Sequence, residues 1–117
     1  MKQINAYGLG ISTTVIPYQF QDLVGTGITH LTVLAADPNK TSQVYGVGFS
    51  TDTTGHYELY IGTEKVNGWF FPTGGGQAQA QILYPFYLDN GVINSEVYLL
   101  KPDGSKIDGV AFIGKGT

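Results

Sequence analysis

Hydrophobic and polar residues alternate with a period of two along much of the chain, which is the pattern of β-strands that bury one face. The segment HYELYIG at 56–62 is the clearest example, because its Tyr, Leu and Ile at every second position fall on one face. We expect 42–50 to alternate in the same way, with Val44 on the face opposite to that of Val47 and Phe49. No segment keeps the 3.6-residue period of a helix, so the pattern predicts an all-β chain.

Turn-forming residues divide the chain into short segments. Proline stands at the second turn position in 37–40 and 101–104, as in type I turns, and Asp-Asn-Gly at 89–91 favours the positive φ of a tight turn. Segment 19–27 is ambiguous between a helical turn and a loop, and 63–68 is expected to be a loop. The predicted strands are 2–7, 11–18, 28–36, 42–50, 56–62, a core strand within the aromatic stretch 68–76, 77–88, 92–100 and 106–113.

The order of these strands predicts a fold class. Three consecutive strands from 28 to 62 and three from 77 to 113 are expected to form two meanders, with the aromatic loop between them. Eight or so strands with a turn every eight to twelve residues are typical of an all-β sandwich or barrel. A chain of 117 residues is long enough for one two-layer core. We therefore predict a single domain, 1–117, that forms an antiparallel β-sandwich, either jelly-roll-like or immunoglobulin-like.

Composition narrows the possible partners. The chain has no cysteine, so it has neither disulfides nor thiolate metal sites, and no arginine, with six lysines against nine acidic residues. Without a basic face it is not expected to bind nucleic acid. It has no apolar run of 18 residues and no signal peptide, so we expect a soluble protein that spans no membrane and leaves the cell, if at all, by assembly or lysis.

No motif identifies a catalytic or metal site. His30 and His56 each lie in a predicted strand and are interpreted as ordinary strand residues, since a metal site needs them to converge with acids. Glu58 and Glu96 are the only acids in mid-strand, and outward, solvated positions explain both. Neither a G-x-S-x-G nor an S-x-x-K motif occurs, and the glycines at 74–76 precede no phosphate-loop lysine. We expect no enzyme activity, cofactor or metal.

Aromatic residues are more abundant than a small core needs. The chain has eight Tyr, six Phe and one Trp, and YPFY at 84–87 places large rings at consecutive positions, on both faces of one strand. One face packs on the core, and the other is expected to be covered by a subunit contact, to stack on sugars, or to thicken the core. Five residues are the predicted interface: Trp69, Phe70, Tyr84, Phe86 and Tyr87.

A Gly-, Thr- and Tyr-rich β chain without Cys or Arg, with the segments WFFP and YPFYLDNG, resembles the small structural proteins of virus and phage particles. These include jelly-roll vertex proteins and capsid decoration (cement) proteins. The resemblance implies a protein without an active site that contacts repeated partners on a lattice. It would be a homo-oligomer, or bind a major shell protein, in the outer shell of a virion.

The leading hypothesis is therefore a non-enzymatic structural protein of a virion or a similar assembly. The glycine-punctuated termini, 1–10 and 114–117, are candidates for arms that become ordered on binding. The alternative is a carbohydrate-binding module or lectin that uses exposed Tyr and Trp together with Asp and Asn. A lectin should present its rings in a concave loop site, and an assembly protein should present them on a broad face or edge.

Overall fold

The computed structural model of the chain describes residues 5–8, 16–23, 29–71 and 78–116, and for 5–8 and 78–86 the description covers the backbone. The described residues form nine strands and no helix. In chain order the strands are β1 (Asn5–Gly8), β2 (Ile16–Asp22), β3 (His30–Leu34), β4 (Thr41–Thr51), β5 (Gly55–Ile61), β6 (Glu64–Phe71), β7 (Ala78–Asp89), β8 (Val97–Leu100) and β9 (Ile107–Gly116).

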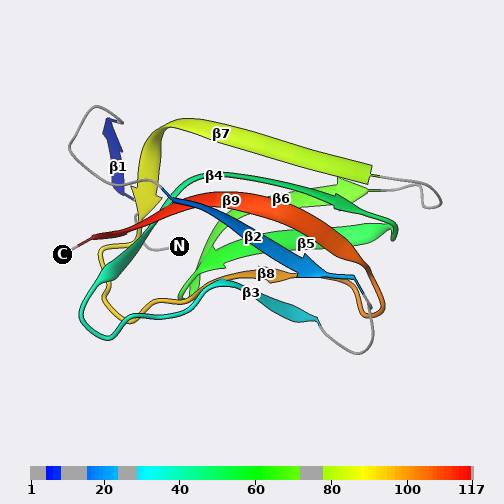
Figure 1. Cartoon of the computed structure of the whole chain (residues 1–117), viewed down its shortest axis with the longest axis horizontal. Coiled ribbons are helices and arrows are strands. Elements are labelled where there is room, and N and C mark those ends of the chain that lie inside the picture. Colours follow the sequence, from blue (N-terminus) through cyan, green and yellow to red (C-terminus); the bar gives the residue numbers. More distant parts are fainter. Residues whose placement is uncertain (1–4, 9–15, 24–28, 72–77, 117) are drawn as a thin grey trace.

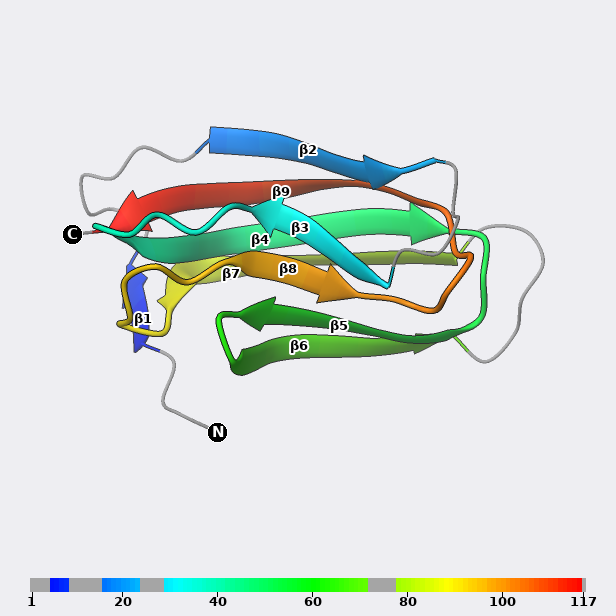
Figure 2. The same cartoon turned by 90° about the horizontal axis from the view of Figure 1, so that it is seen from below.

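The strands form two antiparallel sheets that pack face to face (Figures 1 and 2). Sheet A has five strands in the order β1-β7-β4-β9-β2, and sheet B has four in the order β3-β8-β5-β6. The predicted all-β antiparallel sandwich is confirmed. The face of each sheet that is turned away from the other sheet is called its outer face below.

The pairing between strands is nested along the chain. β5 pairs with β6, β4 with β7, β3 with β8 and β2 with β9, as in one long hairpin folded over itself. The pairs β4–β9 and β5–β8 then close the two sheets. This arrangement is a jelly roll, one of the two sandwich types that were expected.

The two predicted meanders are wrong. β3 and β5 belong to sheet B and β4 to sheet A, and the chain likewise passes from β7 in sheet A to β8 in sheet B and back to β9. Alternation of side chains shows which face of a strand is buried, but it carries no information about which strand lies beside it. Consecutive strands therefore cross between the sheets here although their turn signals are those of hairpins.

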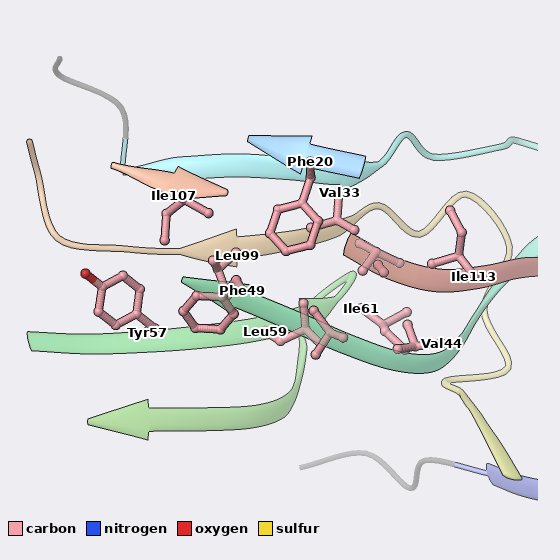
Figure 3. Packing of buried hydrophobic residues seen from close by; sticks show 13 residues of the cluster. Phe20, Val33, Val44, Phe49, Tyr57, Leu59, Ile61, Leu99, Ile107 and Ile113 are labelled. Carbon is pink, nitrogen blue, oxygen red and sulfur yellow. The ribbon is translucent and has the colours of Figure 1, made fainter. Parts of the chain in front are cut away.

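The core lies between the sheets and is made of alternate inward residues from both (Figure 3). The prediction for β5 is confirmed, because Tyr57, Leu59 and Ile61 are all buried. The prediction for 42–50 is wrong at one point: Val44 and Val47 are both buried in the same core. A β-bulge between Val44 and Gly46 places one extra residue in β4 relative to β9 and shifts the alternation, which no periodicity argument anticipates.

Several element boundaries also differ from the prediction. β2 continues through Asp22, so the first part of 19–27 is strand, and the expected loop 63–68 is mostly β6. The chain turns at Gly62, whose φ is 61°, between the paired residues Ile61 and Glu64. The expected strand 92–100 begins only at Val97. The predicted segments 11–15, 24–28 and 72–77 lie outside the described residues.

The C-terminal end is part of the sheet rather than a polar tail. β9 reaches Gly116, which pairs with Thr41 of β4. A Cβ atom at Gly116 would collide with the Thr41 hydroxyl and lie 3.0 Å from the Gln43 side-chain nitrogen, so a glycine suits this close contact. Residues 114–116 thus belong to β9, a role for them as an arm stays a prediction, and residue 117 lies outside the described residues.

Candidate functional site

The structure distributes the five predicted interface residues over two sheets. Trp69 is half-buried on β6, where its ring packs edge-on against Phe49 in the core, with 5.1 Å between ring centroids. Phe70 points to the opposite face and is 57% exposed. The other three predicted residues lie on β7 in sheet A, and the side chains of Tyr84 and Phe86 are outside the described part.

Tyr87, the last of the five, is half-buried, and its ring lies 5.3 Å from that of Tyr45. Tyr45 is itself buried, and its hydroxyl donates a hydrogen bond to Gln43. Tyr87 thus already has an aromatic neighbour within the chain. The role of the five residues in an interface stays a prediction.

Three rings stack across the outer face of sheet B. His30 of β3 stacks on Tyr98 of β8 with 4.1 Å between centroids, and Tyr98 stacks on Tyr60 of β5 with 5.2 Å between centroids and an interplanar angle of 2°. Because each flat face of Tyr98 lies against another ring, this ladder does not offer Tyr98 as a stacking surface for a sugar. Burial raises the pKa of the Tyr98 phenol, and the neighbouring Tyr60 and Glu96 add to this.

Glu96 holds the β3 end of this ladder. Each of its two carboxylate oxygens lies 3.1 Å from Nε2 of His30. It also accepts a hydrogen bond of 2.5 Å from the Thr32 hydroxyl. This acid, predicted to be merely solvated, therefore fixes the orientation of His30 on the sheet surface.

A hollow of about 270 Å³ opens on the outer face of the β5–β6 hairpin. Its lining includes His56, Glu58, Lys65, Gly68 and Phe70. The ammonium of Lys65 lies 2.7 Å from the carboxylate of Glu58. The hydrogen bond to that carboxylate, together with its negative charge, raises the pKa of Lys65.

The outer face of sheet A has a different character. On β9 the outward residues Val110 and Phe112 are 37% and 36% exposed. They pair with Gly48 and Gly46 of β4, so β4 contributes only backbone beside them. β2, at the edge, adds the exposed Pro17 opposite Phe112. Together Pro17, Val110 and Phe112 form an exposed apolar patch on this face.

Among the residues that the structure describes, no group of three or more His, Asp or Glu gathers as a metal site. His30 and His56 share the outer face of sheet B, where each lies against an aromatic ring. No helix in the described ranges is long and apolar enough to cross a membrane. No family model, curated protein or solved structure matches the chain.

Sequence reasoning missed both outer faces as surfaces. Tyr60 and Tyr98 are two of the eight tyrosines in the chain, and their stacking depends on β5 and β8 being neighbours in sheet B although the two residues are 38 positions apart. Gly46 and Gly48 are two positions apart in the sequence and so share one face of β4. That face is identified as part of an apolar surface only when β9 is known to lie beside it.

Proposed function

We propose that the chain is a non-enzymatic structural subunit of a protein assembly, one that stabilises or decorates a shell of the kind that encloses a virus particle. The jelly roll occurs in viral capsid domains and also in lectins and cupins, so the fold alone does not choose between functions. The observation that carries the proposal is the exposed apolar patch of Pro17, Val110 and Phe112 on the outer face of sheet A, with few charges around it.

This face is poor in charge. The described outward residues of β2, β4 and β9 that lie side by side across this face include Pro17, Gln19, Gly48 and Ser50. Asp108 is the one charged residue among them. On β7 the register positions opposite Gly48 and Ser50 are Gln81 and Gln79. Depletion of charge around an exposed aromatic ring, here Phe112, is typical of an interface core rather than of a solvated sheet.

The face is also large enough for a stable contact. Four strands at a spacing of about 4.8 Å and about ten residues at about 3.3 Å each give a plan area of roughly 600 Å². A standard interface buries about 800 Å² on each partner, so the face with its rim reaches that range. We take the partner to be a second copy of the chain, because an uncharged face is compatible with itself.

A twofold arrangement fits this face. Suppose that the twofold axis lies in the contact plane, parallel to the strands and midway between β4 and β9. Each residue of one copy then lies at the same position along the strand direction as its equivalent in the other copy. Phe112 of each copy then faces the Gly46 position of the other, and Val110 faces Gly48, because these are register pairs. The larger side chains of β9 are thereby placed against the bare backbone of β4.

The test is the solution mass by light scattering across a concentration series. We expect an oligomer in the wild type that dissociates in Phe112→Asp and persists in Phe70→Asp, a matched change on the outer face of sheet B. Circular dichroism checks that both variants fold. A monomer at every concentration would overturn self-association, and dissociation by Phe70→Asp alone would move the interface to sheet B.

A further inference from the structure

We infer that the hollow on the outer face of the β5–β6 hairpin is a binding site for a neutral sugar unit. In the β5–β6 pairing His56 lies opposite Phe70 and Glu58 lies opposite Gly68. These four residues therefore enclose one small area of the outer face. Gly68 supplies no side chain, which leaves room for the side chain of Lys65 to cross it and reach Glu58. A volume of about 270 Å³ equals that of about nine water molecules, enough for a single pyranose ring.

The charge of the hollow selects the class of ligand. Glu58 and Lys65 form an ion pair at 2.7 Å and neutralise each other. An anion attracted to Lys65 would be repelled by Glu58, and a cation attracted to Glu58 would be repelled by Lys65. A neutral ligand with adjacent hydroxyl groups avoids both penalties, since it can donate to the carboxylate and accept from the ammonium.

Phe70 supplies the apolar contact that such a ligand needs. Its side chain is 57% exposed, and its ring lies 4.5 Å from the ring of His56 at an interplanar angle of 32°. Unlike Tyr98, it therefore has one ring neighbour rather than two among the described residues. Polar groups that fix orientation beside an aromatic wall are the usual composition of a small-molecule site.

Gly68 provides a variant that closes the site without touching the core. A Cβ atom there would lie 3.1 Å from Cε and 3.3 Å from Nζ of Lys65, because the lysine side chain crosses Gly68 to reach Glu58. The residue is exposed, and its φ is not among the positive values. Gly68→Thr should therefore fill the hollow and displace Lys65 while a β-branched residue suits the strand.

Occupancy of the hollow is followed by NMR, because the ring of the single tryptophan, Trp69, packs on the core side of β6 against Phe49. The full chain is titrated with the methyl glycosides of glucose, galactose, mannose and N-acetylglucosamine, and with phosphate and methylammonium as charged probes. We expect at least one glycoside to shift the amide NMR signals of Glu58 and Gly68.

Gly68→Thr should abolish this binding, and Glu58→Gln should weaken it about tenfold, because a hydrogen bond to a charged group is lost. Glu96→Gln, the same change at the far end of the same face, should leave it unaltered. Tighter binding of phosphate or methylammonium, or no response to any glycoside, would overturn the proposal. Because each probe is a small molecule, this result does not depend on whether the chain assembles.

Discussion

At the scale of single residues, the least expected feature is an ion pair inside the sandwich. Nζ of Lys101 lies 3.1 Å from Oδ2 of Asp22, and the two side chains are 0% and 6% exposed. Lys101 also donates hydrogen bonds to the carbonyl and the hydroxyl of Ser105. The sequence predicts Lys101 as the first residue of an exposed turn, and nothing near it indicates an acid 79 positions away as its partner.

This pair connects β2 of sheet A to the segment that follows β8 of sheet B. Lys101→Met should lower the free energy of unfolding by about 3–5 kcal/mol, because Asp22 then stays buried without a compensating charge. The double variant Asp22→Leu/Lys101→Met should recover most of that loss, since a buried pair adds little over apolar residues of similar volume. Urea denaturation measures both, and a single-variant loss below about 1 kcal/mol would contradict the expectation.

At the scale of elements, the sequence predicts strands better than it predicts loops that are rich in apolar residues. Residues 92–96 belong to the predicted strand 92–100, yet the side chains of Val92 and Ile93 are exposed in a loop. A buried side-chain amide explains the difference. Asn90 donates from Nδ2 to the Ile61 carbonyl and the Ser95 hydroxyl, and its Oδ1 accepts from the amide of Val92.

Further bonds hold the same loop in place. The amide of Asn94, whose φ is 60°, donates to the carbonyls of Asp37 and Lys40. The turn at 37–40 is confirmed by the bond from the amide of Lys40 to the carbonyl of Asp37. The side-chain bonds of Asn90 compete with a sheet ladder, and these backbone bonds add to them, which is why an apolar sequence adopts a loop here.

Replacing Asn90 tests this account of the loop. Asn90→Ala removes the two hydrogen bonds that Nδ2 donates and the one that Oδ1 accepts. Because Asn90 is only 4% exposed, the free energy of unfolding should fall by about 1–3 kcal/mol. Ile93→Ser, three residues away and 52% exposed, is the control and should change stability by less than about 0.5 kcal/mol. Chemical denaturation of both variants decides, and equal effects would show that Asn90 is not what holds the loop.

At the scale of the whole molecule, the sequence predicts the class of fold and leaves its topology open. Alternation and turn signals are local, whereas the nested pairing that distinguishes a jelly roll from an immunoglobulin-like sandwich joins β2 to β9 across most of the chain. The candidate surfaces depend on that pairing, since His30, Tyr60 and Tyr98 meet only because β3, β8 and β5 are neighbours. Their chemistry is visible in the sequence, but their proximity is not.

Two connections that cross between the sheets also meet at one end of the sandwich. Asp52, after β4, accepts a hydrogen bond of 3.0 Å from the amide of Lys106, before β9, and one of 2.8 Å from the Thr53 hydroxyl. These bonds, that from Lys106 foremost, lower the pKa of the Asp52 carboxyl below its ordinary value of 3.8. The folded state therefore prefers the ionised carboxylate, which joins the β4–β5 connection to the β8–β9 connection.

The sign of the pH effect follows from this shift. Since the folded pKa lies below the unfolded one, Asp52 stabilises the fold above about pH 4, and the contribution is lost as the pH falls through the lowered folded pKa. Asp52→Asn retains an acceptor but carries no charge, so the difference in unfolding free energy between wild type and variant should shrink steadily below pH 4. Because Asp52 is exposed and screened by solvent, the difference should stay under about 1 kcal/mol at pH 7. Urea denaturation of both proteins between pH 2 and pH 7 measures it, and a difference that grows on acidification would mean that the carboxylate does not stabilise this end of the sandwich.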